Sequence, residues 1–271
     1  MIFLKTDTAA FTQSPTIHTI VLALIASSGI TLIALQMVFV GWVLLFSCAV
    51  TLLFTEKRFS RDMSLLMTAL AILGFTPINT GISIHHMTVM GLTLVLAVAV
   101  PYAVSRFVFR DFSVRFSWHH RRDWYRSEML YIGIAALSSF LLLPFYLKST
   151  GAYMNWPSAL DSGSIVRLFI GTNALGIWDE LFFVCTVLSI ARRYTSFLLA
   201  NIFQAVLFTS FLYELGFTSW GFIMIFIFAL TQGYIFQKTE SLLYVITIHL
   251  TVDIILFLAL IHTHHFIPVG H

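Results

Sequence analysis

The amino-acid sequence predicts an all-α membrane protein, a polytopic bundle of about nine transmembrane helices. Hydrophobic residues make up 59% of the 271 residues and charged residues only 10%, whereas soluble proteins carry about 25% charged residues. Apolar stretches of about 20 residues, the length that crosses a hydrocarbon core of about 30 Å, recur along the chain. This composition excludes a soluble enzyme, a disulfide scaffold and a disordered chain as the main class.

Apolar segments can be laid out in order along the whole chain. They cover residues 17–35, 37–54, 64–78, 84–104, 128–147, 164–189, 197–213, 219–236 and 241–262. The first two are divided near Gln36 by length alone, because one helix over 17–54 would be about 57 Å long. Cys48 and Cys185 lie inside these segments, so we expect small buried side chains rather than a disulfide.

Loop charges predict how the bundle sits in the membrane. Lys and Arg collect in cytoplasmic loops, and nearly all of the 15 basic residues fall in alternate loops, with only Lys148 and Arg167 on the other face. We therefore expect a multi-pass protein of the cell membrane with the N-terminus inside and the C-terminus outside. The loop from Arg106 to Glu128 interleaves basic and aromatic residues, which is typical of a segment lying on anionic lipid headgroups rather than of a nucleic-acid site.

Histidines outside the spans are expected to be solvated side chains rather than metal ligands. His119 and His120 fall in the basic loop, and the pair His85–His86 follows another loop. No cysteine or carboxylate accompanies them to complete a metal shell. We expect no metal and no other cofactor, although Glu180, Glu214, His249 and Asp253 keep a metalloenzyme open as an alternative.

Ionisable residues inside the later spans are the most informative feature of the sequence. Asp179 and Glu180 lie in one span and His249 and Asp253 in another, with Glu214 at the outer end of the span between them. An ionised carboxylate near the bilayer centre costs about 2.5–3.5 kcal/mol on translocon scales. These carboxylates must therefore be protonated, paired or exposed to an internal pocket.

Helix geometry places the two groups at a similar depth. Measured from a boundary near Ser189, Glu180 lies about 13 Å into the membrane; measured from Ser241, His249 lies about 12 Å into it. His249 and Asp253 share a helix face because they are four residues apart. Asp179 and Glu180 differ by about 100° around their helix, so one is expected to do chemistry and the other to support it.

The order of these motifs resembles the CAAX-protease and bacteriocin-processing (CPBP) family of membrane proteins. The run WDELFFVC at Trp178–Cys185 is similar to the family's glutamate motif EExxxR, and residues 232–255 are similar to its last motif, a short polar turn followed by His and then Asn or Asp. The resemblance covers residues 128–262. It divides the chain into N-terminal helices and the basic loop, residues 1–127, and a CPBP-like core, residues 128–271.

The sequence departs from the family pattern at three positions. Asp179 replaces the first glutamate and Val184 the arginine. Aligning Phe208 with the phenylalanine of the middle motif puts Leu212 where the family has histidine, and a small shift offers Glu214 as a substitute. Glu214 would lie about 26 Å above the cytoplasmic boundary in a straight helix, so it needs a tilted or broken helix to reach the others.

The resemblance implies an intramembrane endopeptidase that hydrolyses a membrane-associated peptide or protein with carboxylate-activated water. Asp179 or Glu180 would be the base, His249 an oxyanion donor, and Asp253 a group that accepts from His249. Besides the metalloenzyme, three alternatives stay open: a catalytically inactive relative that binds or protects a partner, a proton-coupled transporter, and an ion pair that only fixes helix packing.

Overall fold

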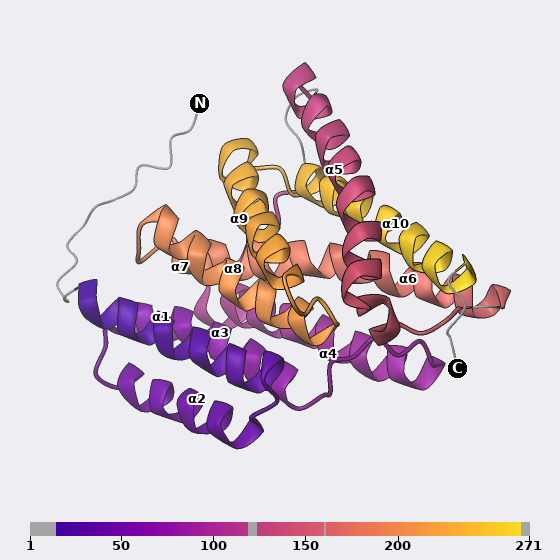
Figure 1. Cartoon of the computed structure of the whole chain (residues 1–271). Helices are drawn as coiled ribbons and strands as arrows, with labels where there is room; N and C mark the ends of the chain where they lie inside the picture. Colours follow the sequence, from indigo (N-terminus) through magenta and orange to yellow (C-terminus); the bar gives the residue numbers. More distant parts are fainter. Residues whose placement is uncertain (1–14, 119–123, 160, 267–271) are drawn as a thin grey trace.

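The described residues of the computed structural model, 15–118, 124–159 and 161–266, form helices and connecting loops and contain no strand. The predicted fold class, an all-α polytopic bundle, is confirmed (Figure 1). Three of the longer helices end in or continue into a π-helical segment, labelled η1, η2 and η4, and η3 is a short 3₁₀ turn. His119, His120 and Lys5 lie outside the described residues.

Every apolar segment of the sequence contributes to a helix. The elements, in chain order, are α1 (Pro15–Gly29), η1 (Ile30–Ala34), α2 (Val38–Leu52), α3 (Lys57–Gly74), α4 (Ile84–Ala103), η2 (Val104–Phe109), α5 (Arg126–Thr150), η3 (Ala152–Asn155), α6 (Ser162–Asp179), η4 (Glu180–Leu188), α7 (Ser189–Ala191), α8 (Phe197–Glu214), α9 (Gly221–Thr239) and α10 (Leu242–Phe266).

Seven helical stretches within the described residues are long and apolar enough to cross a membrane, fewer than the nine spans expected. They are Thr16–Ala34, Ile84–Phe109, Arg126–Thr150, Ser162–Ala191, Phe197–Glu214, Gly221–Thr239 and Leu242–His264. The other two expected spans correspond to α2 and α3. Helix α2 has 15 residues, a length of about 22 Å at 1.5 Å per residue. Helix α3 begins seven residues before the expected span, so its first turns carry Lys57, Arg58, Arg61 and Asp62.

The segment that carries Asp179 and Glu180 runs through the middle of the bundle. The stretch Ser162–Ala191 is the most buried of the candidate spans. In its most apolar 18-residue segment, 72% is buried inside the protein. Helix α10 packs against α5 and α6, α8 packs against α9, and α1 and η1 pack against α8, with α2 packed against α1 (Figure 1). The two ionisable pairs are thus brought into the interior from α6–η4 and α10.

A polar cluster joins three segments of the bundle: the start of α3, the loop after η2 and the loop between α7 and α8. It is made of Asp62, Ser113, Arg193 and Tyr194. Asp62 is fully buried, and its carboxylate accepts hydrogen bonds from the Ser113 hydroxyl at 2.8 Å and the Tyr194 hydroxyl at 2.6 Å and lies 2.7 Å from Nη1 of Arg193. All of these residues come from segments that the loop charges assign to one face. The cluster supports this grouping of the loops, and the orientation of the bundle in the membrane stays a prediction.

The predicted division of the chain after residue 127 falls at the start of α5, after the loop that follows η2. Both sides of this division pack together, because α1 and η1 contact α8. The loop also reaches the later helices, since the backbone N–H of Leu242 donates to the carbonyl of Ser117 at 3.1 Å. The division itself stays a prediction.

Candidate active site

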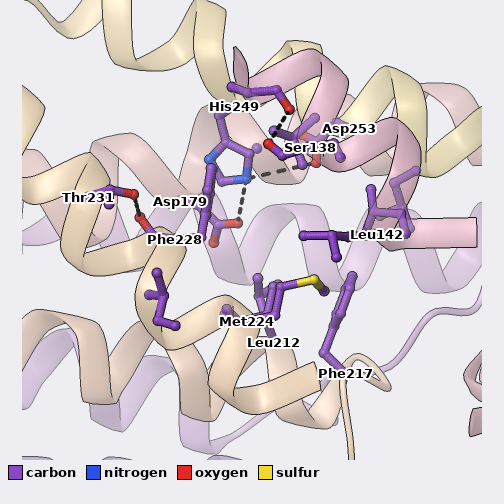
Figure 2. Close-up of a pocket in the computed structure, with 18 of the residues that line it drawn as sticks. Ser138, Leu142, Asp179, Leu212, Phe217, Met224, Phe228, Thr231, His249 and Asp253 are labelled. Carbon is purple, nitrogen blue, oxygen red and sulfur yellow. Dashed lines mark hydrogen bonds and ion pairs between the residues drawn. The ribbon is translucent and has the colours of Figure 1, made fainter. Parts of the chain in front are cut away.

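A cavity of about 500 Å³ lies between α5, α6, α9 and α10. Its polar lining includes Asp179, His249 and Asp253, and most of the rest of its wall is apolar. Figure 2 shows the two aspartates near the His249 imidazole, with Leu212 and Met224 on the opposite wall. The cavity therefore joins three of the ionisable residues singled out in the sequence to an apolar space large enough for substrate side chains.

One side of this cavity is open between α5 and α9. Its lining residues there are largely exposed: Leu142 is 45% exposed on α5, and Ile223 and Ile227 are 50% and 56% exposed on α9. Both helices are candidate membrane spans. The cavity therefore has an apolar opening between two candidate membrane spans, where side chains of both helices are exposed.

His249 is the centre of the polar cluster. Its Nδ1 lies 2.8 Å from Oε1 of Glu180, within hydrogen-bond distance. On the other side of the ring, Nε2 lies 3.7 Å from Oδ2 of Asp179 and 3.8 Å from Oδ1 of Asp253. The expectation that Asp179 or Glu180 lies close to His249 is therefore met by both residues, and they approach opposite nitrogens of the imidazole.

The junction of α6 with the π-helical η4 separates the two acids. Asp179 is the last residue of α6 and Glu180 the first of η4. Asp179 lines the cavity, whereas Glu180 is fully buried behind the imidazole and is absent from the cavity lining. The π-helical segment η4 continues the helix for nine residues, from Glu180 to Leu188. Adjacent residues differ by about 100° around a helix, so one acid lies toward the cavity and the other toward Nδ1 of His249.

Asp253 packs directly against the backbone of α6 at Gly176. A Cβ atom at position 176 would collide with Oδ2 of Asp253 and would lie 3.1 Å from Cδ2 of His249. The glycine therefore leaves the space in which the carboxyl of Asp253 lies. Sequence reasoning did not single out Gly176, although its position three residues before Asp179 puts both on one helix face and was the available signal.

Aromatic rings hold the imidazole on its remaining sides. The ring of Phe228 meets His249 edge-on with centroids 5.1 Å apart, and the ring of Phe208 lies 5.9 Å away. Trp178 anchors α6 to α4, since its indole N–H donates to the carbonyl of Leu94 at 2.7 Å. These contacts fix His249 and α6 by packing rather than by further charges.

The structure does not bring Glu214 into this cluster. Glu214 is the last residue of α8 and is half-buried, and its side chain lies near that of Gln36. Leu212, two residues earlier, lines the cavity instead. The alignment of Phe208 with the middle motif therefore places the family's histidine position at the cavity wall, and that position holds an apolar side chain in this protein.

Each acid of the cluster retains one buried oxygen without a hydrogen-bond partner among the described residues. These atoms are Oδ1 of Asp179, Oε2 of Glu180 and Oδ2 of Asp253. Buried acceptors of this kind are costly unless they are protonated or hydrogen-bonded. The cluster thus combines an imidazole with several acids able to accept or release a proton beside an apolar cavity. In the part of the chain that the structure describes, no three His, Cys, Asp or Glu residues are arranged to hold a metal ion.

The fold and the cluster define a helical membrane protein with a buried acid–histidine site. A family model described as "Type II CAAX prenyl endopeptidase Rce1-like" matches residues 161–255. The CPBP family recognised from the motifs is thereby confirmed over this segment, which runs from the N-cap of α6 past Asp253 and contains the whole cluster. Helices α1 to α5 lie outside the match. No curated protein and no solved structure matches the chain.

Proposed function

We propose that this protein is an intramembrane endopeptidase that cleaves a peptide bond of a membrane-associated peptide or protein, with Asp179 as the general base. The observation that carries the proposal is the cavity: Asp179 and His249 line it, and Glu180 does not. A general base must reach the water that attacks the substrate. Asp179 also stands where the family has its first glutamate, so geometry and motif agree on the same residue.

In the proposed reaction, Asp179 takes a proton from water as the water oxygen attacks the carbonyl carbon of the scissile bond. Nε2 of His249 faces the same space and can donate to the oxyanion that forms. Glu180 acts through His249, because a carboxylate 2.8 Å from Nδ1 stabilises an imidazolium and leaves the second N–H directed at the cavity. Glu180 is thus a positioning residue, and His249 the group that touches the reacting atoms.

The opening between α5 and α9 supports the proposal that the substrate enters the cavity from the bilayer. Apolar side chains surround this opening, and both helices are candidate spans. Peptide segments in a membrane are apolar and enter such a space without the cost of removing polar groups from water. The proposal therefore concerns membrane-embedded or membrane-anchored substrates.

The test compares single variants of the full-length protein in proteoliposomes on a library of membrane peptides. Asp179→Asn is expected to lower turnover about 10²- to 10⁴-fold, the usual contribution of a general base, with an unchanged melting temperature. Asp161→Asn is the matched control, because it makes the same substitution at the exposed N-cap of the same helix and asparagine caps helices as well as aspartate does. This control should keep wild-type turnover.

The variant Glu180→Gln distinguishes the role of Glu180 from that of Asp179. A glutamine still accepts from Nδ1 but does not stabilise an imidazolium, so turnover should survive at low pH and fall with rising pH earlier than in the wild type. Full activity of Asp179→Asn would remove the proposed base. A wild type that cleaves nothing, together with variants that all melt earlier, would favour the packing or partner-binding alternatives instead.

A further inference from the structure

The loop that follows η2 holds exposed arginines against aromatic rings, and the proposed reaction does not use them. The guanidinium of Arg106 lies 4.4 Å from the ring centroid of Phe112, and that of Arg115 lies 5.7 Å from the same centroid. Nε of Arg115 also donates to the carbonyl of Phe112 at 3.0 Å. A third guanidinium, that of Arg61, lies 5.3 Å from the ring of Phe109. Aromatic faces attract cations at these distances, so the rings hold the positive charges in place. We call Arg106, Phe112 and Arg115 the arginine site.

The charges of this segment are separated, with its acid bound to the protein's own backbone and hydroxyl groups. Asp111 is the only acid among residues 104–118. Its Oδ1 accepts hydrogen bonds from the Ser105 hydroxyl at 2.9 Å and from the backbone N–H of Ser113 at 3.1 Å. The ion pairs of the described residues lie in the acid–histidine cluster and around Asp62, and none includes the arginine site. The exposed guanidiniums therefore have no carboxylate partner in the described part of the chain.

This positive surface lies at the end of a candidate membrane span. The stretch Ile84–Phe109 has 26 residues, a length of about 39 Å at 1.5 Å per residue, whereas the hydrocarbon core is about 30 Å thick. Arg106 in its last turn favours this end as the one that reaches the headgroups, because a charge in the core is costly. Phe107 and Val108 beside it are 70% and 67% exposed, and Trp118 is 48% exposed. Exposed apolar side chains and guanidiniums thus lie together, which suits an amphiphilic ligand.

We propose that the arginine site binds the headgroup of an anionic phospholipid, at a position separate from the hydrolytic cavity. Guanidinium groups form charge-assisted hydrogen bonds with phosphate oxygens, often in pairs. Because the Phe112 ring already holds Arg106 and Arg115, less side-chain freedom is lost when the lipid binds. A zwitterionic headgroup brings a cation close to the two guanidiniums and is repelled by them. The site therefore selects lipids with a net negative charge, and Phe107 and Val108 offer apolar contacts to their acyl chains.

The arginine site is joined to the helices that carry the acid–histidine cluster. The residue after its ring, Ser113, donates to Asp62 at 2.8 Å, and Asp62 lies 2.7 Å from Arg193, just after α7. The carbonyl of Ser117 accepts from the backbone N–H of Leu242, the first residue of α10, at 3.1 Å. A ligand that binds only the folded state adds to its stability. Anionic lipid at this site should therefore raise the melting temperature of the protein.

Native mass spectrometry of the full-length protein in a nonionic detergent tests the proposal by counting bound phosphatidylglycerol and phosphatidylcholine with identical acyl chains. The wild type should retain phosphatidylglycerol at concentrations where it loses phosphatidylcholine, and only phosphatidylglycerol should raise its melting temperature. Arg106→Gln and Arg115→Gln should each weaken phosphatidylglycerol binding about fivefold, the factor that corresponds to one basic residue at an anionic membrane surface. Lys57→Gln is the matched control, because it removes an exposed positive charge from the first turn of α3. This control should bind phosphatidylglycerol like the wild type.

Phe112→Leu tests the site without changing any charge. Leucine keeps an apolar side chain but removes the ring that holds the two guanidiniums. Phosphatidylglycerol binding should weaken about two- to fivefold, the factor that corresponds to an exposed cation–π contact. The melting temperature without lipid should stay near the wild-type value, which separates loss of the site from loss of the fold.

Several results would overturn the proposal. Equal retention of the two lipids by the wild type would remove the selectivity, and equal losses in Arg106→Gln and Lys57→Gln would indicate diffuse attraction to the whole basic face. Displacement of phosphatidylglycerol by inorganic phosphate or by a short single-stranded RNA would assign the arginines to a soluble ligand instead of a membrane lipid. None of these results depends on peptide hydrolysis, so this inference and the proposed function are tested separately.

Discussion

Replacing Gly176 by alanine should disable the site while leaving the bundle folded. The new Cβ collides with Oδ2 of Asp253 and lies 3.1 Å from Cδ2 of His249. Non-bonded carbon and oxygen atoms ordinarily stay about 3.5 Å apart, so the carboxyl must move by more than an ångström. A displacement of about 1 Å in a catalytic group costs about a hundredfold in rate, which equals about 2.7 kcal/mol of barrier.

The matched control for this substitution is Gly171→Ala on the same helix. A Cβ there meets Cε of Met87 at 3.8 Å, an ordinary contact. Alanine favours the helix over glycine by about 1 kcal/mol, so Gly171→Ala should raise the melting temperature and keep turnover. Gly176→Ala should melt at or slightly below the wild-type temperature, since the same gain of about 1 kcal/mol offsets only part of a local strain of about 1–3 kcal/mol. Wild-type turnover of Gly176→Ala on the membrane-peptide library would refute the placement of Asp253 against α6.

Three further predictions concern the rest of the molecule. Asp62→Ala should lower the free energy of unfolding by about 3 kcal/mol, because it leaves Arg193 and Tyr194 without their buried partner; chemical unfolding in detergent measures this, and an unchanged midpoint would contradict it. Burial alone would raise the pKa of Asp111, but hydrogen bonds from Ser113 and Ser105 outweigh it and lower the pKa below the ordinary 3.8. Asp111 should therefore stabilise the loop above about pH 4, and melting temperatures of wild type and Asp111→Asn should converge as the pH falls below that value. Cysteines placed at Ser117 and His271 should label from opposite faces of the membrane, with little background because Cys48 and Cys185 are buried; labelling from one face would contradict the loop-charge assignment.

The sequence was sufficient to predict that Glu180 and His249 lie together, because helix arithmetic needs only spacing. Depth estimates from span ends put Glu180 and His249 at one level, and the structure has them 2.8 Å apart. The same arithmetic correctly implied that Asp179 and Glu180 do not reach one atom, since they approach different nitrogens of the imidazole. Charged residues inside a membrane are rare and costly. Their positions along the chain therefore indicate strongly which helices pack together around a shared site.

Other features depend on contacts that spacing does not encode. Which of the two acids lines the cavity depends on how α6 and η4 are rotated in the bundle, and nothing in WDELFFVC marks this rotation. The contribution of α5 to the cavity is equally hidden, because its residues read as an ordinary apolar span. Mean hydropathy also does not reveal that α3 begins at Lys57 and includes four charged residues in its first turns, which is one reason why seven helical stretches of the described residues count as candidate spans where about nine were expected.

Cleavage in isotopically labelled water tests the central claim most directly. Wild-type protein in proteoliposomes is incubated with the membrane-peptide library in H₂¹⁸O, and the new carboxyl termini are analysed by mass spectrometry. The proposed mechanism predicts one solvent oxygen in each new terminus for the wild type and for Asp161→Asn, and none above background for Asp179→Asn at equal melting temperature. Labelled termini formed equally by Asp179→Asn, or no new termini from the wild type, would contradict it.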